Sequence, residues 1–160
     1  MAGSTRGATA GFGFQHGCVF KIISVKDRYG ISLANDSVEP GAKVIVHKSK
    51  NIPSHKFKTE QIEDAPGEYR VSSVLQPSDE LLVWDFIPGE GLVIHNTANS
   101  SMNQIWTTER VHQGNNKICF IKTKDGLCLR NMGKGKQLAL APQNARDPYQ
   151  HWRLDATTSY

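Results

Sequence analysis

Short segments in which apolar and other residues alternate with a period of two recur along the chain at a constant spacing. FKIISVKD begins at Phe20, YRVSSVLQ at Tyr69 and ICFIKTKD at Ile118, so each start follows the previous one by 49 residues. Such alternation predicts strands with one face in a core. Further apolar segments predict two more strands in each copy, at residues 31–33, 81–83 and 127–129, and at residues 43–46, 92–94 and 138–140.

A fourth strand is predicted where each copy ends on an aromatic residue, at Phe57, Trp106 and Trp152. Residues that favour turns, such as Asp125–Gly126 and Pro40–Gly41, separate the segments, and no stretch shows a helical stripe of useful length. One copy alone cannot bury its apolar face, so the three copies must share a core. The sequence therefore predicts an all-β domain with four strands per copy, a six-stranded barrel capped by three hairpins, which is the β-trefoil arrangement.

The repeats also suggest the domain boundaries. The first residues are rich in Gly, Ala, Ser and Thr, which is typical of a flexible segment. We assign residues 1–17 to a flexible lead-in, 18–155 to the β-trefoil domain with repeats 18–60, 69–109 and 117–155, and 156–160 to a tail.

Composition narrows the class of protein. Of the 160 residues, 38% are hydrophobic and 21% charged, which is typical of a soluble globular domain. The net charge of +4 is mildly basic, but Lys and Arg are scattered along the sequence, so we expect no nucleic-acid partner. No apolar run approaches the ~18 residues of a membrane span, so no membrane insertion is expected.

The cysteines bear on the compartment. Three cysteines, Cys18, Cys119 and Cys128, do not make a disulfide framework, and no apolar signal segment is visible near residue 1. We therefore expect reduced thiols and a cytoplasmic location. A Cys119–Cys128 bridge across a hairpin is the alternative that the sequence leaves open.

Nothing in the sequence indicates catalysis. It contains no Gly-rich phosphate loop, no HExxH and no GxSxG, and none of the six histidines has a short metal-site spacing to another His or Cys. We therefore expect a protein that is not an enzyme, with no catalytic residues, no metal and no cofactor.

One motif carries a family resemblance. NQIW at Asn103–Trp106 and QHW at Gln150–Trp152 resemble the Gln-x-Trp motif of ricin-B type β-trefoil lectins, whereas the first copy has His55–Lys56–Phe57 in that place. The layout of EPGAKVIV, from Glu39 to Val46, is similar to small cytosolic β-trefoil lectins of fungi. The resemblance covers residues 18–155. It implies shallow sugar sites for galactose or N-acetylgalactosamine, each made by an acid after the second strand, a ring near the third strand and an Asn before the motif.

Repeat two (residues 69–109) carries most of the residues that the resemblance implies. Asp85 follows the second strand and Asn103 precedes Gln104, and we expect both Asp85 and Asn103 on exposed turns. His95, Trp84 or Phe86 would supply the ring. Gln104 is counted with the site, although in this motif the glutamine chiefly bonds backbone. The alternative is that Asp85, Asn103 and Trp84 have purely structural roles and bind no ligand.

The other two repeats match less well. Repeat one (residues 18–60) offers Asn35, Asp36 and His47, with Ser54 and His55 where the family has Asn and Gln. Repeat three (residues 117–155) has Arg130 and Asn131 in the acidic region, so we expect a degenerate, structural copy.

The function that follows is that of a lectin whose partners are glycans or glycoproteins, with a homodimer as one way to gain avidity. The alternative is a serine or cysteine protease inhibitor that presents the basic loop Lys48–Pro53 to a protease.

Overall fold

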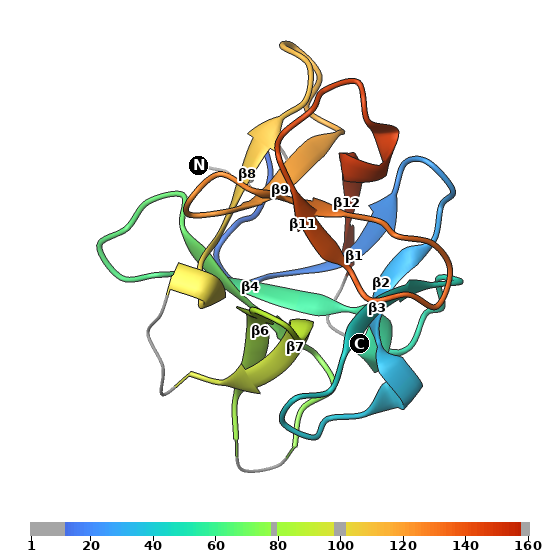
Figure 1. The fold of residues 1–160 in the computed structure, drawn as a ribbon. Helices are drawn as coiled ribbons and strands as arrows, with labels where there is room; N and C mark the ends of the chain where they lie inside the picture. The colour runs from blue at the N-terminus through green and yellow to red at the C-terminus, as the bar shows by residue number, and fades with distance from the viewer. Residues whose placement is uncertain (1–11, 78–79, 98–101, 158–160) are drawn as a thin grey trace.

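The computed structural model describes residues 12–77, 80–97 and 102–157 (Figure 1). Among these residues, twelve strands form one continuous sheet, and the only helices are 3₁₀ turns of three residues. The strands are β1 (Cys18–Ser24), β2 (Gly30–Leu33), β3 (Val44–His47), β4 (Phe57–Gln61), β5 (Tyr69–Ser73), β6 (Leu82–Ile87), β7 (Gly91–Asn96), β8 (Trp106–Arg110), β9 (Cys119–Thr123), β10 (Cys128–Arg130), β11 (Ala139–Ala141) and β12 (Trp152–Thr157). The 3₁₀ turns are η1 (Ala34–Asp36), η2 (Pro53–His55), η3 (Met102–Gln104) and η4 (Pro148–Gln150).

Six of the strands close into a barrel. The antiparallel pairs run β1–β4, β4–β5, β5–β8, β8–β9, β9–β12 and back from β12 to β1, which leaves no free edge in the ring. The remaining strands form the three hairpins β2–β3, β6–β7 and β10–β11. The predicted all-β class, the four strands per repeat and the β-trefoil arrangement are therefore confirmed.

The three aromatic residues that end the repeats occupy equivalent places. Phe57, Trp106 and Trp152 begin the barrel strands β4, β8 and β12, and all three are fully buried in the shared core, as predicted. The Trp106 indole Nε1 donates to the backbone oxygen of Trp84 at 3.4 Å, and Trp152 Nε1 donates to that of Leu129 at 3.1 Å. These two bonds identify Trp84 and Leu129 as equivalent residues of β6 and β10.

Described residues near both ends of the chain contact the barrel. Phe14 was assigned to the flexible lead-in, yet its side chain is only 2% exposed and packs on Phe20 and Tyr69 in the core. Its backbone N–H donates to Thr108 Oγ1 at 3.2 Å. At the other end, β12 continues through Thr157, which pairs with Val19. Residues before β1 thus contact the barrel through Phe14 and through the Gln15 oxygen, which accepts from Thr59 Oγ1 at 2.6 Å. Residues 1–11 and 158–160 lie outside the described residues.

All three cysteines are free. Cys128 lies opposite Lys122 in the β9–β10 pair, not opposite Cys119, and the bridge that the sequence left open is not formed. Burial raises the pKa of the Cys119 thiol to about 12 and that of Cys128 to about 11. Both groups are protonated at neutral pH and are poor nucleophiles. No helix in the described chain is long and apolar enough to cross a membrane.

Candidate functional site

The two faces of the β6–β7 hairpin differ in chemistry. Trp84 pairs with Ile94, and both side chains belong to the core. Asp85 pairs with Val93, and Val83 pairs with His95. Because side chains alternate between faces, Asp85 and His95 share the face opposite Trp84 and Ile94 as diagonal neighbours. We call this the outer face of the hairpin; on it Asp85, Val83 and Val93 are buried and His95 is half-buried.

Asp85 is held by the 3₁₀ turn that precedes β8. Its side chain is 5% exposed, and Asp85 Oδ2 accepts a hydrogen bond from Gln104 Nε2 at 3.1 Å. The same Gln104 Nε2 donates to the backbone oxygen of Asn96 at 2.8 Å. The expectation that Asp85 lies on an exposed turn is wrong, because the residue lies inside β6 and η3 packs over it. The carboxylate is therefore fixed in one orientation.

Asn103 and Gln104 are adjacent in η3 but have different environments. Asn103 is exposed, as predicted, whereas Gln104 is fully buried. Gln104 Oε1 has no hydrogen-bond partner among the described residues, while the equivalent Gln150 Oε1 accepts from the Asn144 N–H at 2.9 Å. Gln104 thus positions Asp85 and closes the loop after β7, and it does not present a surface to a ligand. Residues 98–101, between His95 and Asn103, lie outside the described residues.

Trp84 is not a surface platform. Its ring is fully buried and makes edge contacts with Phe57 at 5.3 Å and with Trp106 at 5.7 Å between ring centroids. Full burial leaves this ring no exposed face, because Trp84 fills a core position of β6. Phe86 is partly buried and packs against the core. Of the three rings that the sequence offered, His95 is the one on the outer face.

Repeat one gathers its predicted residues around a buried histidine. Asn35 and Asp36 are exposed in η1 and have left-handed backbone angles, with φ of 56° and 54°. Asp36 Oδ1 accepts from Ser54 Oγ at 2.5 Å. That hydrogen bond places Asp36 beside η2, which also carries His55. Burial lowers the pKa of His55, and the negative charge of Asp36 opposes this shift.

Repeat three has a cation at the position of the repeat-two acid. Arg130 follows Leu129 as Asp85 follows Trp84. Arg130 Nε donates to Asp147 Oδ2 at 2.8 Å, and the guanidinium carbon lies 4.9 Å from the centre of the Tyr149 ring. The Arg130–Asp147 pair was missed by the sequence analysis, because its members are 17 residues apart and no short pattern marks them.

Asn131, in the same repeat, has a structural position. Its side chain is fully buried, and Asn131 Nδ2 donates to Ser24 Oγ and to Asp27 Oδ2, both at 2.9 Å. Asn131 Oδ1 accepts from the Gly133 N–H at 2.8 Å. The residue therefore ties the β10–β11 loop to the β1–β2 turn.

The outer face of the β6–β7 hairpin and the adjoining turn η3 carry groups that form hydrogen bonds. The Asp85 carboxylate is oriented but almost fully buried, His95 is half-buried on the same face, and the exposed amide of Asn103 lies in the neighbouring turn η3. The described residues contain no group of three or more His, Cys, Asp or Glu side chains that could hold a metal ion.

Neither a protein-family model nor a curated protein sequence matches the chain. Solved structures do match. The designed threefold-symmetric protein ThreeFoil superposes with a TM-score of 0.71 and 15% identity, over 86% of this chain and 97% of ThreeFoil. The Macrolepiota procera ricin B-like lectin in complex with lactose gives 0.66 and 17%, over 91% of this chain and 99% of the lectin.

The Polyporus squamosus lectin, bound to the epitope Neu5Acα2-6Galβ1-4GlcNAc, gives a TM-score of 0.67 and 16% identity over 89% of this chain. This chain spans 50% of the length of that lectin. At such identities the three similarities establish the fold, and they agree with the β-trefoil arrangement read from the strand pairing.

Proposed function

We propose that the chain is a lectin that binds galactose or N-acetylgalactosamine on the outer face of the β6–β7 hairpin, without catalysis. The observation that carries the proposal is the carboxylate of Asp85. Gln104 holds it in one orientation, on the hairpin face that also carries His95, and exposed Asn103 adjoins Gln104 in η3.

The physical argument rests on what a sugar offers. A hexose presents paired hydroxyls and an apolar face of C–H groups. Hydrogen bonds to an ionised acceptor are roughly twice as strong as neutral ones, so a fixed carboxylate is a good partner for two hydroxyls. An amide supplies both donors and an acceptor, and the imidazole of His95 supplies a flat ring for the C–H face.

The structural neighbours support the choice of sugar class. The Macrolepiota procera lectin is described with lactose and the Polyporus squamosus lectin with a galactose-containing epitope. In this chain, repeat one is proposed as a second, weaker site, formed by Asn35, Asp36 and His47. Repeat three is proposed as structural, because Arg130 stands where an acid is required.

The remaining features of the proposal concern partners and location. A shallow single site binds weakly, so a homodimer or a second site would raise the avidity for a multivalent glycan. A cytoplasmic location agrees with three free thiols, two of them buried. The inhibitor alternative gains no support. Within the loop Lys48–Pro53, the Lys50 N–H is held by His55 Nδ1 at 3.3 Å.

The experiment that tests the function is calorimetric titration of the chain with lactose and N-acetylgalactosamine, with mannose as the control sugar. Asp85→Asn keeps an acceptor for Gln104 but removes the charge, so affinity should fall about tenfold with little loss of stability. His95→Ala and Asn103→Ala should also weaken binding.

The matched control is His112→Ala, which removes an exposed histidine from the β8–β9 connection. It should leave the affinity unchanged. No binding of either galactose-type sugar, or equal affinity in the wild type and Asp85→Asn, would reject the repeat-two site.

A further inference from the structure

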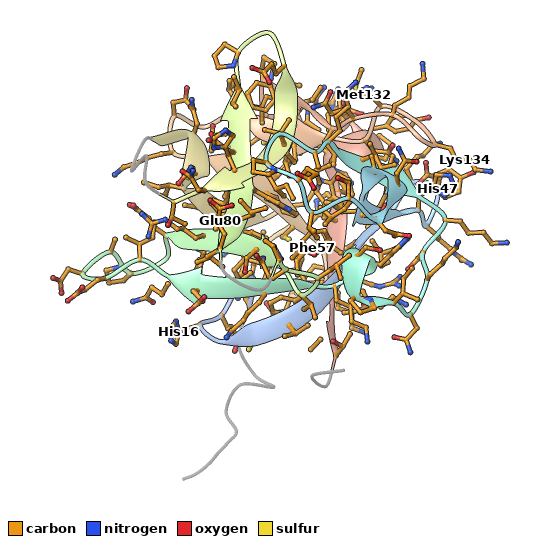
Figure 2. The ribbon with its side chains drawn as sticks, turned by 90° about the horizontal axis from the view of Figure 1, so that it is seen from below. His16, His47, Phe57, Glu80, Met132 and Lys134 are labelled. Atoms are coloured by element: carbon orange, nitrogen blue, oxygen red, sulfur yellow. The ribbon has the colours of Figure 1, made fainter. Side chains whose placement is uncertain are left out.

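Exposed cationic side chains gather where three connections of the chain meet. The β1–β2 turn contributes Lys26 and Arg28, the connection after β3 contributes Lys48 and Lys50, and the β10–β11 loop contributes Lys134 and Lys136; all six are exposed. We call these six residues the basic rim. Figure 2 shows Lys134 next to His47, the last residue of β3, with Met132 nearby on the same side of the molecule.

Backbone hydrogen bonds bring the second and third of these connections together. The Gly135 N–H donates to the Val46 oxygen at 2.7 Å, and the Val46 N–H donates to the Lys136 oxygen at 3.2 Å. Ile45 and Gln137 form an antiparallel bridge beside them. The β10–β11 loop thus runs along β3, as Figure 1 shows, and places its two lysines beside the segment that carries Lys48 and Lys50.

The β1–β2 turn is fixed to the same place by buried polar contacts. Asn131 donates to Ser24, the last residue of β1, and to Asp27 of the turn, and it accepts from Gly133 of the β10–β11 loop. Gly30, at the end of the turn, pairs with His47. A Cβ at Gly30 would lie 3.2 Å from the Ser49 side chain, so the turn also abuts the connection after β3. The rim is therefore built on a fixed frame, although its side chains are exposed.

The basic rim concentrates the positive charge of the protein. Residues 24–29, 48–52 and 131–137 contain the six cations and one carboxylate, Asp27, and thus carry five net positive charges, whereas the whole chain carries +4. The rest of the chain therefore sums to about one negative charge. The Asp27 carboxylate accepts hydrogen bonds from Asn131 Nδ2 and from the Tyr29 N–H, so both of its oxygens are already bonded within the protein. Six of the nineteen Lys and Arg residues, scattered in the sequence, are thus carried by three neighbouring connections, with Asp36 of η1 beside the segment that carries Lys50.

We propose that the basic rim binds a sulfated polysaccharide, at a site separate from the neutral-sugar face of repeat two. An exposed ion pair contributes only ~0.2–1 kcal/mol, so a surface of six separate ammonium and guanidinium groups favours a polymer that offers many fixed charges at once. Sulfate esters along a sugar chain are such charges, and lysine ammonium groups meet them as point charges without a fixed geometry.

The described structure favours a polysaccharide over nucleic acid or a membrane. Reading a duplex groove requires a helix or a two-stranded ribbon that enters it. The described helices are three-residue turns, and the two hairpins beside the rim, β2–β3 and β10–β11, pack side chains such as Ile31, Val46 and Leu129 into the core, so neither is a free ribbon. Single strands bind by stacking on aromatic rings, and the Tyr149 ring next to the rim is already under the Arg130 guanidinium at 4.9 Å and near the Lys26 ammonium at 5.8 Å. A membrane surface would require an apolar face, and the described rim segments have only two large exposed apolar side chains, Val25 and Met132.

The test is a titration of the full chain with fluorescently labelled heparin, a sulfated polysaccharide, and with the same polymer after complete desulfation. The rim variant is Lys48→Glu/Lys134→Glu, with one change on each of two connections. The control is Lys58→Glu/Lys117→Glu, which alters the net charge equally at exposed lysines of β4 and of the β8–β9 connection. Should the first variant fold poorly, Lys50→Ser/Lys136→Ser tests the same surface.

We expect the wild type to bind heparin in a salt-dependent manner and to ignore the desulfated polymer. The rim variant should bind at least about tenfold more weakly with an unchanged melting temperature, and the control less than about threefold more weakly. Equal losses in both variants would reduce the effect to net charge and overturn the proposal. Tighter binding to duplex DNA, or to phosphatidylserine vesicles, than to heparin would overturn the choice of partner.

The rim and the repeat-two site can fail independently. Lactose titration of the same samples separates them, because Lys48→Glu/Lys134→Glu leaves Asp85, His95 and Asn103 untouched. Heparin binding without lactose binding would reject only the neutral-sugar site, and the reverse result would reject only the basic rim.

Discussion

The hairpins of repeats two and three have the same strand arrangement but carry opposite charges at equivalent positions. In both, a buried tryptophan of the next barrel strand donates to the carbonyl of the residue just before the position in question. That position is Asp85 in repeat two and Arg130 in repeat three. The comparison teaches that the buried bonds maintain the repeat, while the outer position is free to change its chemistry.

The partners of the two residues explain why both are tolerated. Asp85 is oriented by Gln104, which bonds backbone at the same time. Arg130 finds a carboxylate, Asp147, and a ring, Tyr149, within its own repeat. An oriented carboxylate suits hydroxyl groups, whereas an arginine already paired within the protein has little to offer a neutral sugar. The four predictions that follow test this contrast.

The largest effect is expected in the core beneath the two positions. Trp84→Ala and Leu129→Ala should each lower the free energy of unfolding, by about 3–5 and 2–5 kcal/mol, because each leaves a cavity in the shared core. Guanidinium denaturation measures both. Trp84→Phe should cost less than Trp106→Phe, because the Trp84 N–H has no partner among the described residues and the Trp106 N–H has one. Equal costs would contradict this reading of the two indoles.

The second prediction is a crossover between the repeats. Asn131→Ala breaks three hydrogen bonds of a fully buried side chain and should cost about 1–3 kcal/mol of stability, with lactose affinity unchanged. Asp85→Ala removes the hydrogen bond from Gln104 and should cost less stability, about 1 kcal/mol, yet weaken lactose binding about tenfold or more. Thermal melts and lactose titrations of the same two proteins check both halves. Sugar binding lost with Asn131 and kept without Asp85 would move the site to repeat three.

The third prediction concerns the cation itself. Arg130→Ala removes one partly exposed ion pair and the contact with Tyr149, so the free energy of unfolding should fall by only about 1 kcal/mol. It should not create a sugar site, because alanine supplies no acceptor. Urea denaturation and a lactose titration measure these effects. A loss above about 3 kcal/mol would show that the pair is a major determinant of the repeat-three fold.

The smallest expected effect is a dependence of folding stability on pH. Histidines in repeats one and three contribute to it, and repeat two has no histidine at the equivalent positions. Burial lowers the pKa of both His55 and His151 below the ordinary 6.5, whereas repeat two has Gln104 and Ile105 at these positions. The unfolded chain then binds more protons below about pH 6.5, so stability is full above that pH and decreases as the pH falls below it.

His55→Gln tests this dependence, since Gln150 shows that glutamine accepts a backbone N–H in the equivalent place. The variant should lose less stability than the wild type between pH 7 and pH 5, as measured by denaturation midpoints. Parallel curves for the two proteins would show that His55 does not contribute.

Much of the fold could be predicted from the sequence because it depends on periodicity. The alternation in residues 20–27, 69–76 and 118–125 and the recurrence of Phe57, Trp106 and Trp152 are one-dimensional signals of a repeated apolar face. They predicted the strands, the closed barrel and the buried aromatic residues. The same pattern predicted that Asp85, His95 and Asn103 belong to one hairpin and its following loop.

The environment of each candidate residue was decided by the tertiary structure. Trp84 is core and Asp85 is buried because η3 folds back over β6, a contact between residues about twenty apart that no local pattern encodes. Phe14 joins the core through Thr108 and Tyr69, which are far from it in sequence. The basic rim exists only because the β10–β11 loop bonds to β3, so lysines at 48, 50, 134 and 136 become neighbours. Sequence thus determined which residues alternate and repeat, whereas burial and charge clustering depended on long-range contacts that form only when the barrel closes.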